Sequence, residues 1–270
     1  MATFSREQIR AFLVRIGYPV EPQGLPTASG GLLSELHWAH LQAVPFENLD
    51  IVRLGRQIRL DPVELYGKIV GERRGGYCFE VNGLLAEVLT GIGFGVRLVM
   101  VQFVEEGGLS PAFDHLALIV TIPGDGERRL VDVGSGRQAF PHPLRLVPDV
   151  DQPAPEVDTT YRLTRTDDRW VVHTMVGGAD WAPWYTFDET PRELADFAGR
   201  NAFFQTDPSS HFRQGPMATL SRPGGRVTIT GDRLIETVGG VRTERAVSPE
   251  EADALLASEF GIELRDERAR

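Results

Sequence analysis

The chain of 270 residues contains only one cysteine, Cys78. A single cysteine cannot form a disulfide within the chain, and by itself it cannot supply the several thiolates of a structural zinc site. Disulfide-stapled scaffolds and multi-cysteine zinc modules are therefore excluded as fold classes. Because disulfides are rare in the reducing interior of cells, we expect a cytoplasmic location.

Basic residues are in the minority, since 28 lysines and arginines stand against 38 aspartates and glutamates, giving a formal net charge of −10. Binding to nucleic acid without sequence preference requires a basic surface, so we expect no nucleic-acid partner. Long apolar runs are also missing, and the N-terminal segment is interrupted by Arg6, Glu7 and Arg10. We therefore expect neither a signal peptide nor a membrane-spanning helix, and no membrane partner.

Helical periodicity dominates the first part of the chain. Helices are predicted over 4–16, 31–43 and 61–70, and from Cys78 to about Thr90 with Gly91 as C-cap. The apolar residues of this last segment recur on one helix face: Val81, Leu84, Leu85, Val88 and Leu89. We expect an N-terminal helical bundle over residues 1–95.

Short β-rich segments follow Gly95, separated by turn residues; they cover 96–104, 115–122, 128–133 and about 160–174. A helix over 190–204 with Thr190 as N-cap comes next. The chain then continues with antiparallel strands over 225–247 and a Ser248-capped helix over 248–261. This order predicts an α+β protein of three parts: residues 1–95, 96–189 and 190–270.

The stretch RRGGYCFEVNG (73–83) places Cys78 at the start of the fourth helix, on the same face as Val81 and Leu85. The sulfur is therefore expected to point inward. The free N–H groups and positive end of the helix favour a thiolate and predict a lowered pKa. Gly75 and Gly76 leave space for another group near the sulfur. The competing interpretation is a buried structural cysteine, which is the commoner case for a lone thiol.

A nucleophilic cysteine needs a base, and His115 is the strongest of the six histidines because it begins a strand. Asp132 follows 17 residues later, beyond a predicted turn. In a hairpin these two side chains face the same side for any register whose paired residue numbers sum to an odd value. Asp132 could instead cap the turn after its strand. His37 and His40 could form a metal pair, but packing roles are favoured and no metal site is expected.

Five segments together carry a family resemblance: VPFENLDI (44–51), RGGYCFEVN (74–82), DHLALIV (114–120), LVDVGSG (130–136) and FFQTDPSSHF (203–212). In this order they resemble the arylamine N-acetyltransferase family. The resemblance implies a helical first domain, a barrel-like β-rich second domain and a C-terminal α/β lid. It also implies acetyl-CoA as cosubstrate, with an aromatic amine, hydrazine or hydroxylamine as acceptor.

Carried over to this sequence, the resemblance makes Cys78 the acetylated nucleophile, His115 its base and acid, and Asp132 the partner that orients the histidine. This is a papain-like Cys-His-Asp arrangement. Phe46 and Phe212 match positions expected to line the acceptor pocket.

The glycines of the DVGSG segment, Gly134 and Gly136, would let the backbone approach the coenzyme or the acyl group. Similar proteins often carry an aromatic residue within this turn, and in this sequence Ser135 occupies that position. That difference removes one apolar wall and bears on acceptor preference.

Four further residues are predicted to support the site. Glu47 and Arg74 flank two of the motifs and could pair, holding PFEN against RGG, although two separate solvated charges are the usual case. Glu80 is expected to cap backbone N–H groups in the first turn of its helix, and Asn82 completes the same motif. The phosphates of coenzyme A need donors, for which the candidates are Arg97, Arg137, Arg222 and Arg226.

Three other functions stay open at this point. A related amide synthase would close macrolactams from a carrier-bound acyl chain, and Ser135 could suit such a larger substrate. A papain- or transglutaminase-like hydrolase shares the same catalytic residue types. A non-catalytic binding module would retain only the fold. The oligomeric state, monomer or homodimer, is also open.

Overall fold

The computed structural model describes residues 4–21, 24–124, 126–136 and 139–264. Its N-terminal helices are α1 (Arg6–Arg15), α2 (Gly30–Ala43), α3 (Pro62–Tyr66) and α4 (Cys78–Ile92), with π-helical turns η1 (Asp50–Leu54) and η2 (Gly67–Gly71). Side chains cap the first turns of α1, α2 and α3, from Ser5, Ser29 and Asp61. The helical first part is therefore present.

Two predicted boundaries in this part are wrong. The helix expected over 61–70 is α-helical only as far as Tyr66 and continues as the π-helical turn η2. The helix that begins at Cys78 runs two residues beyond Thr90, and Gly93, not Gly91, adopts the left-handed conformation at its C-terminus with φ 113°. A glycine accepts that conformation without the steric cost that a Cβ atom brings.

A nine-stranded antiparallel sheet forms the barrel-like second part, with path β6-β5-β4-β2-β10-β9-β8-β7 and β3 paired to β2. Its strands are β2 (Gly95–Glu105), β3 (Gly108–Leu109), β4 (His115–Thr121), β5 (Arg128–Val131), β6 (Leu144–Arg145), β7 (Asp151–Ala154), β8 (Thr159–Thr166), β9 (Arg169–Val176) and β10 (Ala182–Asp188). A short 3-10 turn, η4 (Pro155–Val157), precedes β8.

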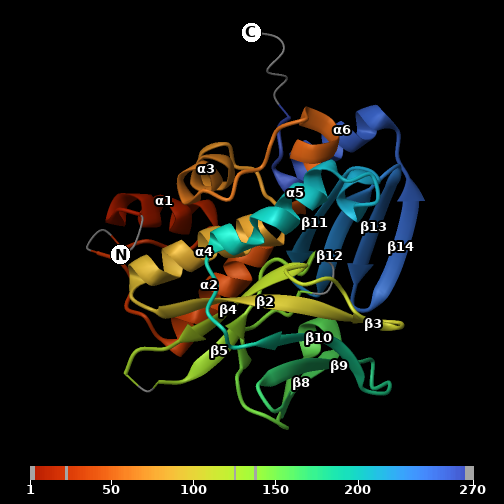
Figure 1. Cartoon of the computed structure of the whole chain (residues 1–270). Coiled ribbons are helices and arrows are strands. Elements are labelled where there is room, and N and C mark those ends of the chain that lie inside the picture. The colour runs from red at the N-terminus through yellow and green to blue at the C-terminus, as the bar shows by residue number, and fades with distance from the viewer. Residues whose placement is uncertain (1–3, 22–23, 125, 137–138, 265–270) are drawn as a thin grey trace.

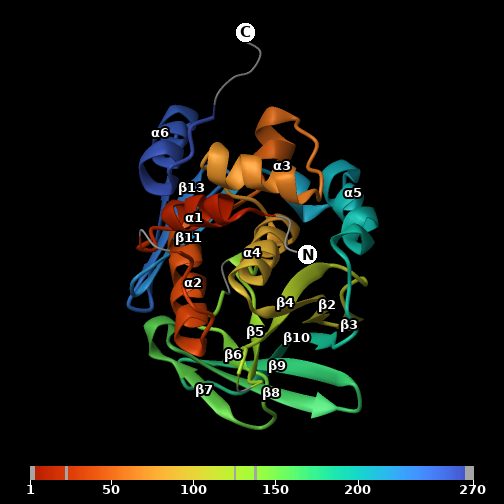
Figure 2. The same ribbon diagram turned by 90° about the vertical axis from the view of Figure 1, so that its left-hand side faces the viewer.

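Helix α4 packs on this sheet, against β2 and β4, and its other side meets α1 and α3 (Figures 1 and 2). Successive side chains of β4 point to opposite faces of the sheet, so the strand contributes to two separate apolar layers. Leu118 and Val120 join the core under the helices, while Ala117 and Ile119 join a second core inside the sheet.

A five-stranded sheet of order β1-β11-β12-β13-β14 makes up the third part with helix α6 (Figure 1). Its elements are β1 (Phe46–Glu47), β11 (Met217–Arg222), β12 (Gly225–Thr230), β13 (Arg233–Val238), β14 (Val241–Ala246) and α6 (Pro249–Phe260). The predicted strands over 225–247 and the Ser248 cap of α6 are confirmed. Strand β1 belongs to the N-terminal part of the chain, so the parts interleave.

The segment that links the two sheets differs from its prediction. It contains η5 (Leu194–Phe197), α5 (Ala198–Thr206) and η6 (His211–Arg213) instead of one helix over 190–204. Thr190 is not an N-cap, because its N–H is bonded to Asp188 and the N–H of Arg192 is bonded to the carbonyl of Leu98. The chain from Thr190 to Arg192 therefore runs beside β2, and helix α5 begins only after it.

The mixed α+β architecture agrees with expectation, while the domain boundaries at residues 95 and 189 stay predictions. Over the ranges that the structure describes, no helix combines the length and apolar character that crossing a bilayer requires.

Candidate active site

Cys78 is the first residue of α4, and its side chain is only 3% exposed. The preceding glycines are packed closely. A Cβ atom on Gly75 would lie 1.8 Å from the carbonyl oxygen of Pro45, and one on Gly76 would lie 2.6 Å from a carboxylate oxygen of Glu80. The space at these two glycines is therefore occupied by Pro45 and Glu80, and the glycines serve to bring RGG against the segment that contains Phe46.

His115 and Asp132 lie on the same side of the β4–β5 hairpin, as predicted. Leu118 is paired with Val131, numbers that sum to an odd value, so Asp132 follows β5 diagonally across from His115. Nε2 of His115 lies 2.7 Å from Oδ2 of Asp132, and the same imidazole interacts electrostatically with the Cys78 thiol. In space, the imidazole therefore lies between the thiol and the carboxylate.

The Asp132 carboxylate has donors at both oxygens. Oδ1 accepts from Nδ2 of Asn82 and from the Gly134 N–H, each at 2.9 Å, and Oδ2 also accepts from the Ser135 hydroxyl. Ser135 thus contacts the carboxylate directly, which its sequence position did not indicate.

Asn82 ties three elements together from its place one turn after Cys78. It donates to the carbonyl of Leu116 at 2.7 Å and accepts from the N–H of Val133 at 2.9 Å, besides its bond to Asp132. A Cβ atom on Gly134 would lie 2.6 Å from the Cα of Cys78, so this glycine allows the turn after β5 to touch α4.

Charge is distributed unevenly over the three residues. Burial alone lowers the pKa of His115, but the Asp132 carboxylate outweighs burial and raises that pKa to about 10. Burial alone raises the pKa of Asp132, but His115 and the hydrogen-bond donors hold it below its usual value. The site therefore favours an imidazolium beside a carboxylate.

The pKa of the Cys78 thiol shifts in the direction opposite to the one predicted from its position at the start of a helix. Burial raises the pKa of Cys78, although the hydrogen bonds from His115 and from the Leu116 N–H oppose that change. A thiolate at this position therefore depends on proton transfer to His115 and not on the helix end alone.

A cavity of about 930 Å³ opens onto Cys78 and His115. The predicted acceptor and backbone positions all line it: Phe46, Gly134, Ser135, Gly136 and Phe212. The third part of the chain supplies another wall, with Thr219, Thr228 and Arg242.

Of the four arginines considered for coenzyme A, only Arg226 lines this cavity. Arg97 and Arg222 are bonded to Glu189 and Glu259 instead, and Arg137 lies outside the described residues. Sequence reasoning missed Arg200 and Asp114, which also line the cavity.

A buried cluster of charges lies beneath the first turn of α4. Nη2 of Arg74 lies 2.8 Å from Glu47 and 3.0 Å from Asp50, so the predicted contact between Glu47 and Arg74 is present. Nζ of Lys68 lies 2.7 Å from Asp50 and 2.7 Å from Glu80. Asp50 and Lys68 were not predicted, because their contacts join elements that are separate in sequence.

Glu80 connects this cluster to the nucleophile's helix. Its Oε2 accepts from the backbone N–H of Tyr77 at 3.1 Å, as predicted for a capping carboxylate. Burial raises the pKa of Glu80 to about 7, although Lys68 opposes this change.

His37 and His40 are buried in the helical core. Nδ1 of His37 donates to the carbonyl of Pro141, and its ring is stacked on Phe140 with centroids 5.5 Å apart. Their packing role agrees with the favoured interpretation. In the part of the chain that the structure describes, histidine, cysteine and acidic residues form no group suited to a metal ion.

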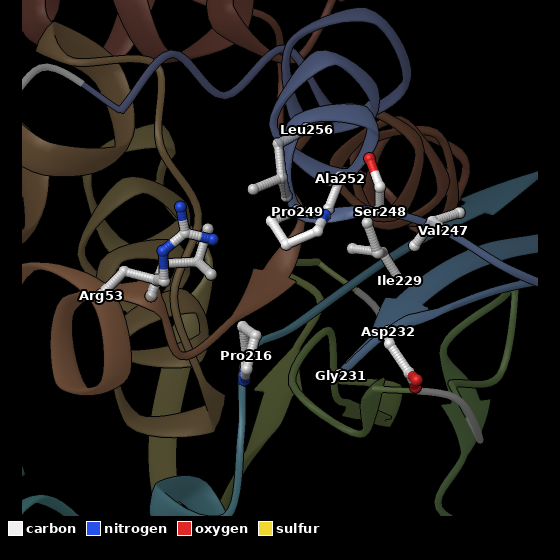
Figure 3. Close-up of a pocket in the computed structure, with 11 residues that line it drawn as sticks. Arg53, Pro216, Ile229, Gly231, Asp232, Val247, Ser248, Pro249, Ala252 and Leu256 are labelled. Atoms are coloured by element: carbon white, nitrogen blue, oxygen red, sulfur yellow. The ribbon is translucent and has the colours of Figure 1, made fainter.

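A second, smaller cavity of about 180 Å³ lies on the other face of β12, between Arg53 and the α6 residues Pro249, Ala252 and Leu256 (Figure 3). Alternation along β12 separates the two cavities, because Ile229 faces this one while Thr228 and Thr230 face the cavity at Cys78. Among the residues that line the small cavity there is no cysteine and no histidine.

The fold is shared with solved arylamine N-acetyltransferases. The pattern of a family described as N-acetyltransferase matches residues 31–269. The chain belongs to the arylamine N-acetyltransferase family.

Three relatives illustrate the similarity. The arylamine N-acetyltransferase of Mycolicibacterium smegmatis is 36% identical over 261 residues, covering 94% of this chain and 92% of that protein. The arylamine N-acetyltransferase / N-hydroxyarylamine O-acetyltransferase of Salmonella typhimurium is 34% identical over 250 residues, covering 91% and 86%. A solved Mycobacterium marinum arylamine N-acetyltransferase in complex with CoA is 32% identical, with TM-score 0.84, covering 94% of this chain and 92% of that one.

Proposed function

We propose that the chain transfers an acetyl group from acetyl-CoA to an aromatic amine, hydrazine or hydroxylamine in two stages, with Cys78 as the residue that carries the acetyl group. The activity itself, an acetyltransferase with acetyl-CoA as cosubstrate, follows from family membership. The assignment to Cys78 is carried by one observation: the only thiol of the chain lines the same cavity as a histidine whose Nε2 lies 2.7 Å from a buried carboxylate.

In the first stage His115 takes the proton of Cys78, and the sulfur attacks the carbonyl carbon of the acetyl thioester. The carbon–sulfur bond to coenzyme A breaks, and the coenzyme A thiolate leaves with the proton that His115 returns. The Cys78 backbone N–H at the start of α4 is a candidate donor to the oxyanion.

In the second stage the amine nitrogen attacks the acetyl-cysteine, and His115 accepts the proton that the nitrogen loses. The bond between sulfur and acetyl carbon breaks, which regenerates Cys78. Asp132 stabilises the imidazolium in both stages and fixes its orientation, because Nε2 faces the carboxylate and leaves Nδ1 for the reacting groups.

The acceptor lies in the cavity lined by Phe46 and Phe212, whose rings contact each other with centroids 6.1 Å apart. Two aromatic walls suit a flat aromatic amine. Ser135 adds a hydroxyl to the cavity lining, and because this hydroxyl donates its proton to Asp132, it can only accept a hydrogen bond from the acceptor. The C-terminal sheet closes the cavity from the third side and acts as its lid.

The test is release of coenzyme A from acetyl-CoA with and without a panel of arylamines, measured on the wild type and on Cys78→Ala. We expect turnover only in the presence of an amine and none from Cys78→Ala. Turnover by Cys78→Ala would refute the role of Cys78. Peptide or glutamine hydrolysis without coenzyme A would favour a hydrolase, and activity restricted to carrier-bound acyl chains would favour an amide synthase.

A further inference from the structure

Two neighbouring residues of α5 contact the residues that immediately precede Cys78 and His115. Oδ1 of Asn201 accepts a hydrogen bond from the hydroxyl of Tyr77. Nε of Arg200 donates to Asp114 at 2.8 Å, and Nη2 of the same guanidinium donates to the same oxygen. The segment that contains α5 runs from the end of β10 past α4 to the five-stranded sheet (Figure 1).

The contact at Tyr77 is fully enclosed. Tyr77 is 0% exposed, and its ring lies 5.0 Å from that of Phe212. Asn201 is itself anchored, because its Nδ2 donates to the carbonyl of Ile58 at 3.0 Å. A buried hydroxyl requires a partner, so this bond fixes the side chain of the residue at which α4 begins.

The contact at Asp114 holds an unfavourable turn. Phe113 has φ 63°, a left-handed conformation that is sterically unfavourable for a bulky residue. Its ring meets the edge of Phe197 at 5.3 Å, and the Arg192 guanidinium lies 5.5 Å above it. Arg200 is braced in turn by the rings of Phe203 and Phe204, at 4.3 and 4.8 Å.

These contacts bridge two separate elements. Cys78 belongs to α4 and His115 to β4, so a small shift of one element against the other would separate the thiol from the imidazole. We propose that Arg200 and Asn201 are positioning residues that keep Cys78 and His115 facing each other across the same cavity. The inference rests on the proposed roles of Cys78 and His115, and neither Arg200 nor Asn201 is assigned a chemical step.

The experiment measures alkylation of Cys78 by iodoacetamide as a function of pH, followed by intact mass. The variants are Arg200→Gln, Asp114→Asn, Tyr77→Phe and Asn201→Leu. We expect each to slow alkylation at neutral pH by about tenfold to a hundredfold, the loss that a misplacement of roughly 1 Å produces. We also expect the midpoint of the pH profile to rise, because a displaced imidazole no longer favours the thiolate.

Two features separate positioning from general stability. Arg200→Lys keeps the charge and should recover most of the rate. The Tyr77→Phe/Asn201→Leu double variant should be no slower than Asn201→Leu alone, because the bond between Tyr77 and Asn201 is already absent from that variant. Arg162→Gln is the matched control. Arg162 is also paired with an aspartate, at 2.6 Å, and lies over the ring of Trp181 at 4.3 Å, but it belongs to the far end of the barrel-like sheet.

Lowered melting temperatures with an unchanged alkylation rate and pH midpoint would overturn the inference and leave a purely structural role. If Arg200→Gln does not fold, Tyr77→Phe decides the question, since it removes only one oxygen atom. Alkylation requires neither acetyl-CoA nor an amine. A wild type that is alkylated normally but never acetylated would therefore contradict the proposed function and leave this inference standing.

Discussion

Asp132 is the residue whose charge organises the site, since it raises the pKa of His115 to about 10 against the opposing effect of burial. Asp132→Asn should keep the turn folded, because an amide oxygen still accepts from the Gly134 N–H. In this variant no carboxylate charge stabilises the His115 imidazolium, and the ring is no longer held in its orientation. We expect the single-turnover rate of acetylation, measured by rapid-mixing release of coenzyme A, to fall by about 10⁴-fold. A loss smaller than about tenfold would contradict the role given to Asp132.

Gly134 is the residue that lets the turn after β5 approach α4. In Gly134→Ala the new Cβ would lie 2.6 Å from the Cα of Cys78 and 2.7 Å from Nδ2 of Asn82, so the turn must move away. We expect the acetylation rate to fall by about a hundredfold.

The matched control for Gly134→Ala is Gly199→Ala, at a helical position with no other atom within 4 Å of the new Cβ. That change should raise the free energy of unfolding by about 0.5–1 kcal/mol and leave the rate unchanged. Equal rates for the two variants would show that the close approach at Gly134 is not needed.

At the scale of elements, the buried charges join η1, η2 and α4 beneath the nucleophile. Arg74→Met removes the partner of Glu47 and Asp50 and leaves Lys68 as the remaining nearby cation of the cluster. Because buried charges without partners are costly, we expect a loss of about 3–5 kcal/mol in the free energy of unfolding, measured with urea.

Arg53 provides the comparison for Arg74, since it is paired with Asp253 at 2.8 Å but its side chain is 34% exposed. Arg53→Met should cost about 0–1 kcal/mol. Similar losses in the two variants would mean that the buried cluster contributes no more than a surface ion pair.

At the scale of the whole molecule, buried ionisable groups give the unfolding free energy its pH dependence, and His37, His40, Glu80 and His115 are among them. Burial lowers the pKa of His37 to about 4 and that of His40 to about 3, so the stability they contribute is present above pH 6.5 and is lost as the pH falls. The pKa of Glu80 is raised to about 7 by burial, and that of His115 to about 10 by Asp132. Their contribution is present at low pH and is lost as the pH rises through those values.

We therefore expect maximum stability near pH 6 to 7, roughly where the two trends cross. Urea denaturation across the pH range measures this. His40→Leu removes one of the groups whose stabilisation is lost at acidic pH. Stability should therefore fall less steeply as the pH is lowered, while its fall at basic pH should be unchanged. Stability that rises steadily from neutral to basic pH would contradict the assignment.

The sequence was most informative where local patterns were sufficient. Helix α4, the cap at Ser248 and the shared face of His115 and Asp132 all follow from residue spacing within one element or one hairpin. Strands β1 and β11 could not be predicted in this way, because Phe46 pairs with Thr219, far along the chain. The start of α5 was also misplaced, because contacts of Arg192 with β2 override the local helical signal.

Electrostatic properties were the least predictable part of the site. Placing Cys78 at a helix start predicted a lowered thiol pKa, yet burial by residues from several elements reverses the direction. Ser135 was interpreted as a missing apolar wall, while the structure gives its hydroxyl a bond to Asp132. Both effects depend on neighbours that meet only after folding.

The central claim is that Cys78 carries the acetyl group between donor and acceptor. It is tested most directly by mixing the chain with acetyl-CoA in the absence of amine and recording its intact mass, followed by peptide mapping. The account predicts a gain of one acetyl group, located on Cys78, that disappears when an arylamine is added. An unchanged mass, or acetylation that persists in Cys78→Ala, would contradict it.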